Sequence, residues 1–332
     1  MLSGVLCLLV IIVIVALIFD YVNGFHDSAN AIATVVSTRA LTPRQGVLLA
    51  GALNFIGAFL STHVAQTVGK GLVDVVQVTQ VVVLSGLIGA IIWNLLTWYF
   101  GLPSSSSHAL IGGLVGAVIV HSGLAFVHWM DIVKKVLLPA VISPVIGLIV
   151  GFIFMVILIW TFRKANPFKV NNFFRKAQIV SASFMALSHG TNDAQKVMGI
   201  ITLALLSAGA INVFEVPMWV KVACALAMAL GTSAGGWRII RTLGAKTVKL
   251  KPIQGFAAET AASIVLFTTA HFGFPVSTTH VITSSIMGAG ATQRLSAVRW
   301  GVANTILMAW IFTLPASALM GGIAYALLKF VF

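Results

Sequence analysis

Residues 103–108 read Pro-Ser-Ser-Ser-Ser-His, and residues 275–280 repeat the pattern as Pro-Val-Ser-Thr-Thr-His. Each copy lies in a strongly apolar part of the chain, where clustered hydroxyl groups are costly unless they find polar partners. The two closing histidines are 172 positions apart, about half of the 332-residue chain. The repeat therefore predicts a polar site that is built from two related halves.

A second repeated motif lies well upstream of each hydroxyl motif. Residues 24–30 read Gly-Phe-His-Asp-Ser-Ala-Asn, and residues 190–196 read Gly-Thr-Asn-Asp-Ala-Gln-Lys. The aspartates of the two copies are 166 positions apart, so both motifs recur at nearly the same interval. Asn30 and Lys196 each follow an aspartate by three positions, which places the members of each pair on one helix face.

Composition predicts an all-α integral membrane protein with several spans. Apolar residues make up 59% of the chain and charged residues 8%, against about 25% charged residues in soluble domains. Apolar runs exceed the ~18–20 residues that cross a bilayer as a helix. The first run, Leu2–Phe19, lacks a basic leader and a clean cleavage site, so we expect a retained span rather than a signal peptide.

The charges between the apolar segments predict the topology. Basic residues gather in four loops, at 39–44, 163–176, 238–251 and 294–299. If each segment crosses once, these loops share one side, and the positive-inside rule makes that side cytoplasmic. The formal charge of +13 therefore reflects topology, and we expect no binding to nucleic acid. We count ten apolar segments: 2–38, 46–66, 79–100, 103–121, 134–161, 177–209, 217–236, 252–273, 275–291 and 300–331.

Five crossings in each half predict two repeats of inverted topology, an arrangement common in secondary transporters. We assign residues 1–161 to an N-terminal transmembrane repeat and residues 177–332 to a C-terminal transmembrane repeat. The basic stretch 162–176 would be a cytoplasmic linker between them.

Four segments are expected to depart from simple straight spans. Segments 2–38 and 177–209 are too long for one straight span, so we expect each to break or tilt near its polar motif. Segments 103–121 and 275–291 are short and begin with Pro, Ser and Thr, which favours broken or re-entrant helices.

The hydroxyl motifs predict two helix starts that bind one anion. Pro103 favours the first turn of a helix, where hydroxyls lie beside N–H groups without intrahelical acceptors. Such amides and the positive end of the helix dipole bind anions, so a small oxyanion fits. The alternative is that both motifs only cap helices. The candidate anion-binding residues are Ser105, Ser106, Ser107, Ser277, Thr278 and Thr279, with Asn30 and Lys196.

Acidic residues inside apolar segments predict cation binding or coupling. Each costs about 2.5–3.5 kcal/mol to insert at membrane depth, and carboxylate and amide oxygens are hard ligands that suit Na⁺. Protonation of one acid is the alternative. Lys196 either forms an ion pair with Asp193 or contacts the anion directly, and Asp20 is expected at the membrane interface. The candidate cation-binding or coupling residues are Asp27, Asn30, Asn192, Asp193 and Glu259.

The histidines and cysteines do not predict a metal centre beyond the coupling cation. No pair of histidines has a short zinc-type spacing, and neither cysteine lies beside one. We expect structural roles for His26, His108, His189 and His280.

The four ordered motifs resemble those of the inorganic phosphate transporter (PiT) family of sodium- or proton-coupled phosphate permeases. Each half of that family carries a G-x-N-D-x-x-N-A type signature and, downstream, a P-x-S-x-x-H type motif. The resemblance covers essentially the whole chain. It implies an inverted-repeat carrier, not an enzyme, that imports inorganic phosphate by symport with Na⁺ or H⁺. It also implies a multi-pass protein of the cell membrane, no cofactor besides the coupling ion, and a homodimer.

The chain departs from the family pattern at three places. His26 stands where the family favours asparagine, and Gln195-Lys196 stands where a symmetric site would have Ala-Asn. Glu259 has no counterpart in the first half. The cation sites of the two halves are therefore not expected to be equivalent. Other functions also stay open: transport of sulfate or of a metal–phosphate complex and, in a different class, an ion channel.

Overall fold

The computed structural model describes residues 2–74 and 78–331, which are helical and contain no strand beyond an isolated bridge between Val73 and Val127. The predicted all-α class is confirmed. The helices are α1 (Leu2–Ser37), α2 (Pro43–Gly57), α3 (His63–Lys70), α4 (Gln80–Phe100), α5 (Ser106–Ser122), α6 (Trp129–Ile132), α7 (Leu138–Phe162), α8 (Pro167–Ser207), α9 (Met218–Ala234), α10 (Trp237–Arg241), α11 (Pro252–His271), α12 (Thr278–Ala291) and α13 (Trp300–Leu328).

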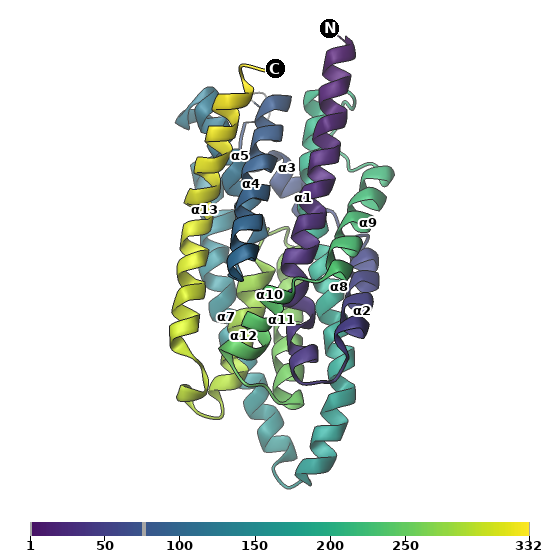
Figure 1. The fold of residues 1–332 in the computed structure, drawn as a ribbon, viewed down its shortest axis with the longest axis vertical. Helices are drawn as coiled ribbons and strands as arrows, with labels where there is room; N and C mark the ends of the chain where they lie inside the picture. Colours follow the sequence, from purple (N-terminus) through teal and green to yellow (C-terminus); the bar gives the residue numbers. More distant parts are fainter. Residues whose placement is uncertain (1, 75–77, 332) are drawn as a thin grey trace.

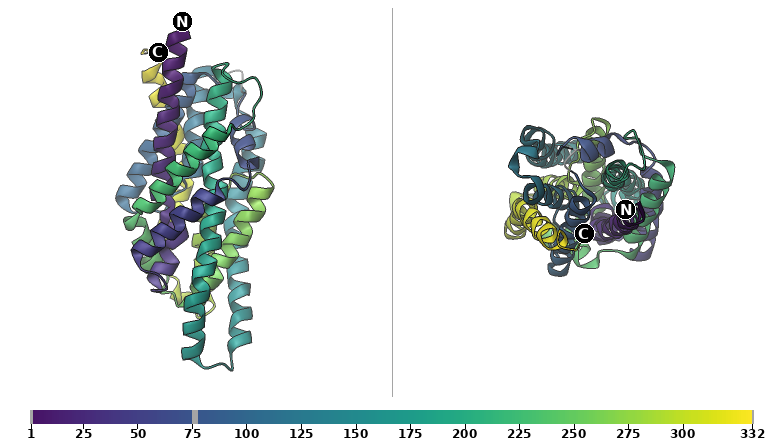
Figure 2. Two further views of the ribbon diagram at one scale, coloured as in Figure 1. Left: turned by 90° about the vertical axis from the view of Figure 1, so that its right-hand side faces the viewer. Right: turned by 90° about the horizontal axis from the view of Figure 1, so that it is seen from above.

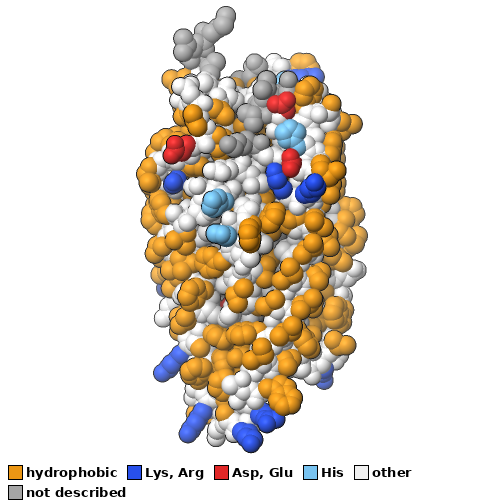
Figure 3. Space-filling view, turned by 180° about the vertical axis from the view of Figure 1, so that it is seen from behind, with side chains coloured by type: hydrophobic (Ala, Val, Ile, Leu, Met, Phe, Trp, Pro, Cys, Tyr) orange, Lys and Arg blue, Asp and Glu red, His pale blue; other side chains and the backbone are white. Residues whose placement is uncertain are grey.

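The long helices run along one axis of an elongated bundle (Figures 1 and 2). Both termini lie at one end, and the turn between α7 and α8 lies at the other (Figure 1). Hydrophobic side chains cover the middle of the surface, whereas Lys and Arg side chains gather at the end away from the termini (Figure 3). Near the terminal end, basic side chains are mixed with acidic ones (Figure 3). An apolar belt between charged ends is the surface that a bilayer requires.

Four helical stretches in the described residues are long and apolar enough to cross a membrane. A fifth candidate is α9 together with the helix that starts at Trp237, bent by 56° between them. The remaining helices are shorter or more polar, so the count of ten crossings stays a prediction. The four stretches are Leu6–Ser37, Gln80–Phe100, Trp129–Phe162 and Trp300–Leu328.

The two longest helices pass through the aspartate motifs without a break, so the expectation of broken segments there was wrong. Helix α1 has 36 residues and α8 has 41, lengths of about 54 and 62 Å at 1.5 Å per residue. Neither contains an internal proline. Their buried polar side chains bond to neighbouring helices, so the backbone keeps its own hydrogen bonds.

The chain breaks instead before α5 and α12. Gly101 (φ 66°) and Gly273 (φ 72°) adopt the left-handed backbone that ends α4 and α11, a conformation that glycine tolerates best. Each glycine lies two positions before the motif proline. The prediction that Pro103 lies in the first turn of a helix was wrong, because α5 begins three residues later, at Ser106. Helices α5 and α12 have 17 and 14 residues, fewer than the ~20 of a full span.

The two halves of the chain are interlaced. Helix α1 packs on α9 and α8 on α2, while α5 packs on α13 and α12 on α7. The pairings correspond between the halves. If α1, α2, α5 and α7 are matched with α8, α9, α12 and α13, the contact of α1 with α9 corresponds to that of α8 with α2, and the contact of α5 with α13 corresponds to that of α12 with α7. Two related halves produce such a pattern. The inverted orientation and the repeat boundaries, including the linker 162–176, stay predictions.

Glycines of the aspartate motifs allow α1 and α8 to approach their partner helices closely. A Cβ atom on Gly24 would overlap the backbone of Met228 and Thr232 on α9. A Cβ atom on Gly190 would overlap the backbone of Asn54 on α2. Small residues at such crossings permit tight helix packing in membranes, and here the crossings lie one turn from the aspartates.

We expect Gly190→Val to lower the melting temperature of the purified protein strongly. Overpacking typically costs about 1–3 kcal/mol, and a backbone atom of Asn54 cannot move aside as a side chain can. The matched control is Gly301→Val on α13, where nothing lies within 4 Å of the added carbon. Equal melting temperatures for the two variants would contradict the close crossing.

Candidate functional site

Polar side chains of α1, α5, α8 and α12 meet inside the bundle. The aspartate motifs contribute from within the two long helices, and the hydroxyl motifs contribute from the first turns of the two short ones. The structure thus brings together motifs that are far apart in the sequence. The connected side chains are Asp27, Asn30, Ser107, Asp193, Lys196, Thr278 and Thr279, each at most 4% exposed.

The two motif aspartates lie close to one another. Asp27, His189 and Asp193 each offer a ligand atom, and these atoms all lie within 4.8 Å of one another. Two negative charges at this separation repel by about 3 kcal/mol at an effective dielectric constant of ~20. The pair of carboxylates therefore requires positive charge or hydrogen-bond donors beside it.

Threonines of α12 supply donors to both carboxylates. Thr278 Oγ1 donates to Asp193 Oδ2 at 2.9 Å, and Thr279 Oγ1 donates to Asp27 Oδ1 at 3.5 Å. Asn30 Nδ2 donates to the same two hydroxyl oxygens, at 3.2 Å and 2.9 Å. The hydroxyls that the sequence assigns to an anion are thus held by the two acids.

Lys196 forms an ion pair with Asp193, which was one of the two alternatives for this lysine. Its ammonium contacts Asp193 Oδ1, donates to Ser107 Oγ, and donates to the carbonyl oxygen of Val276 at 3.0 Å. An ammonium group has three hydrogens, so these three acceptors can use all of them. Because Ser107 lies in the first turn of α5 and Val276 precedes α12, the lysine also joins the two helix starts.

The remaining motif hydroxyls divide into three kinds. Ser104 Oγ donates to Thr97 Oγ1 at 2.9 Å. Ser105 Oγ accepts from the His108 amide, and Ser277 Oγ accepts from the His280 amide, both at 3.2 Å. These two serines are N-caps, which was the alternative interpretation of the motif. Ser106 differs, because its buried hydroxyl has no partner among the described residues. With the amides of a helix start beside it, Ser106 remains available to an anion.

Two histidines support the aspartates, which the sequence analysis missed. His26 Nδ1 lies 2.7 Å from Asp27 Oδ1, and its Nε2 lies 3.1 Å from Thr97 Oγ1. His189 Nε2 lies 3.1 Å from Asp193 Oδ2, and Nδ1 lies 3.2 Å from Asn54 Oδ1. Each ring is held from its far side. His26 hydrogen-bonds to the Asp27 carboxylate, and His189 lies beside the Asp193 carboxylate. The spacing of four between His189 and Asp193 was the available signal.

Asp20 and Asn192 are buried polar residues outside the connected group. Asp20 lies beside the Cys224 thiol and Asn23. Asp20 is 0% exposed, and neither carboxylate oxygen accepts a hydrogen bond among the described residues. The prediction that Asp20 lies at the membrane interface was therefore wrong. Helix α1 continues for 17 residues beyond Asp20 into the bundle. The Asn192 amide is likewise buried, and within the described parts of the chain no hydrogen bond links it to the acids.

Glu259 lies in a separate polar network. It accepts hydrogen bonds from Thr34 Oγ1 at 2.5 Å, from Gln178 Nε2 at 3.0 Å and from the Ser181 hydroxyl. Thr34 follows Asp27 by seven positions, about 10 Å along α1. The structure therefore does not bring Glu259 into the group formed by Asp27 and Asp193.

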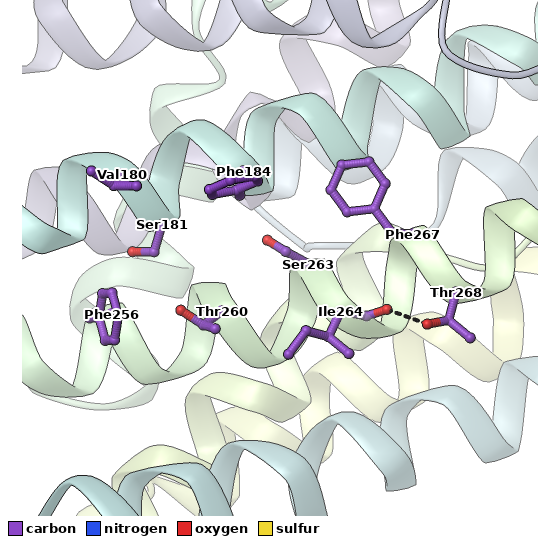
Figure 4. Close-up of a pocket in the computed structure, with 9 residues that line it drawn as sticks. All are labelled: Val180, Ser181, Phe184, Phe256, Thr260, Ser263, Ile264, Phe267 and Thr268. Atoms are coloured by element: carbon purple, nitrogen blue, oxygen red, sulfur yellow. Dashed lines mark hydrogen bonds between the residues drawn. The ribbon is translucent and has the colours of Figure 1, made fainter.

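A crevice of about 490 Å³ lies between α8 and α11 beside this network (Figure 4). The Ser181 hydroxyl points between the two helices (Figure 4), so the crevice shares a wall residue with the Glu259 network. Most of its other walls are apolar. The lining residues are Val180, Ser181, Phe184, Phe256, Thr260, Ser263, Ile264, Phe267 and Thr268.

Comparisons with known proteins agree with this architecture. Residues 23–321 match the model of the phosphate transporter family. A Mycobacterium bovis protein named "Probable low-affinity inorganic phosphate transporter" is 51% identical over 98% of this chain and 79% of its own length. A Bacillus subtilis protein of the same name is 48% identical over 98% and 99%. A solved structure described as "The sodium-dependent phosphate transporter" superposes with a TM-score of 0.91 at 27% identity, covering 98% of this chain and 100% of the other.

We expect Glu259→Gln to lower the melting temperature. Three groups donate to the two oxygens of this carboxylate. An amide has one acceptor oxygen in place of two and no negative charge, so at least one of these hydrogen bonds is lost or reversed and the others weaken, at a cost of about 1–3 kcal/mol. The control is Glu215→Gln, which removes a carboxylate from an exposed loop residue. Unchanged melting of Glu259→Gln would contradict the three-donor network.

Proposed function

Since the chain belongs to the phosphate transporter family, we propose that it imports inorganic phosphate by symport with a coupling cation, Na⁺ or H⁺. Its relatives and its fold are those of transporters rather than enzymes, and it is a multi-pass integral protein of the cell membrane. One observation carries the proposal. Two buried carboxylates contact the hydroxyls of a helix start, which puts a cation ligand and an anion donor in direct contact.

Phosphate binding would use the two helix starts. Amides there have no intrahelical acceptor, and the positive ends of the helix dipoles favour an anion. The hydroxyl of Ser106, which has no partner among the described residues, supports this role. The Ser107 hydroxyl accepts from Lys196 and donates to the Val276 carbonyl oxygen at 3.5 Å, a long contact that phosphate would replace. The Thr278 and Thr279 hydroxyls would donate to phosphate when the aspartates no longer accept from them.

Coupling would follow from competition for those threonine hydroxyls. Asp27 accepts from Thr279, and Asp193 accepts from Thr278. A cation that binds the Asp27 carboxylate would replace the hydroxyl as its partner and free that hydroxyl for phosphate. Each ligand would then raise the affinity for the other, because binding free energies are coupled reciprocally.

The identity of the cation is part of the proposal. The solved relative is described as sodium-dependent, which supports Na⁺ for this chain at the Asp27 site, with H⁺ as the alternative. The homodimer that the family resemblance implies is likewise a proposal, and light scattering of the detergent-solubilised protein tests it.

Uptake of radiolabelled phosphate into proteoliposomes tests the function. We expect accumulation driven by an inward Na⁺ or H⁺ gradient, counterflow from preloaded vesicles, and no inhibition by excess sulfate. Absence of accumulation under both gradients would overturn symport. Gradient-independent uptake without counterflow would identify a channel, and competition by sulfate would identify a broader oxyanion carrier.

We expect Asp27→Asn and Asp193→Asn each to reduce concentrative uptake to that of empty liposomes. Asp27→Asn removes the charge that binds the cation, and Asp193→Asn leaves the buried Lys196 ammonium without its counter-ion. The control is Asp131→Asn, which removes an acid from a half-exposed pair with Lys135. Folding is checked by size-exclusion profile, and normal uptake in both site variants would remove the aspartates from the mechanism.

A further inference from the structure

We propose that the Lys196 ammonium permanently fills, in the second half, the place that a dissociable coupling cation fills in the first half. The carrier would then bind one coupling cation, beside Asp27, and none beside Asp193. This inference rests on the proposed cation-coupled transport and adds to it which half binds the ion.

Lys196 and Asn30 occupy equivalent positions. Each follows its aspartate by three residues on an unbroken helix. Asn30 donates to Thr279 at 2.9 Å, and Lys196 donates to Ser107. Thr279 and Ser107 are themselves equivalent, because each directly precedes the histidine of its hydroxyl motif. The two halves thus make the same contact with a neutral amide in one case and a cation in the other.

The ligands of the ammonium are those that a hard metal cation would use. Its three contacts are the Asp193 carboxylate, the Ser107 hydroxyl and the Val276 carbonyl oxygen, and oxygen donors of these kinds suit hard cations. The lysine side chain is 2% exposed. Because its three hydrogens are engaged, the ammonium neither leaves these oxygens open to Na⁺ nor has a donor for direct contact with an anion.

The charge balance differs between the halves in the way this inference requires. Asp193 has a permanent positive charge beside it. Asp27 is paired with His26, and no lysine or arginine of the described residues forms an ion pair with it. A buried anion close to Asp27 therefore needs an added positive charge there, whereas the Asp193 side already carries one.

Counting bound Na⁺ tests the inference. Purified protein with saturating phosphate is equilibrated with radioactive Na⁺, and bound Na⁺ per chain is measured for the wild type and for Lys196→Asn. We expect Lys196→Asn to bind one Na⁺ more than the wild type, whether the wild type binds one or, if H⁺ is the coupling ion, none. Equal counts would overturn the inference.

Two controls and a second variant complete the experiment. Lys196→Arg keeps a fixed positive charge, and Lys135→Asn removes one from a half-exposed pair, so neither should gain a Na⁺. If Lys196→Asn does not fold, Lys196→Gln is measured in the same way. Because Na⁺ would substitute for the missing ammonium, Lys196→Asn and Lys196→Gln should each have a higher melting temperature in NaCl than in choline chloride. Failure of Na⁺ to bind or stabilise either variant would overturn the inference.

Failure of the proposed function is detected separately. Wild-type proteoliposomes that accumulate no phosphate under either gradient would overturn symport. The Na⁺ counts of the Lys196 variants would still decide whether the ammonium holds a cation position.

Discussion

Two carboxylates buried within 4.8 Å of one another are the constraint on which the structure depends. Each charge is costly inside a membrane protein, and their repulsion adds to that cost. The surroundings offset it with the Lys196 ammonium, two histidines and the threonine hydroxyls of α12. To deliver these groups, helices from both halves must interlace, and Gly24 and Gly190 let the aspartate-bearing helices lie close to their partners.

The sequence predicts the parts of this arrangement that repeat. Composition predicts helices and a membrane, and two pairs of motifs predict which residues meet. The alternative that the motifs cap helices holds for Ser105 and Ser277, because a serine side chain at a helix start accepts from the amide three positions later. Gly101 and Gly273 were the missed signals, since a glycine two positions before each proline marks where α4 and α11 end.

Other features depended on contacts that no local pattern contains. The unbroken course of α1 and α8 is possible because their polar side chains find partners on other helices, such as Thr97 for His26. Glu259 looked like part of the cation site because it is acidic and in an apolar segment. Its donors Gln178 and Ser181 lie earlier on α8, and nothing in their sequence indicates that α11 packs there.

The continuity of α1 and α8 has a mechanical consequence. An unbroken helix that carries its binding residues about two thirds of the way along can tilt as one body about those residues. When such a helix tilts, its two ends move in opposite directions, so widening the approach from one face of the membrane narrows the approach from the other.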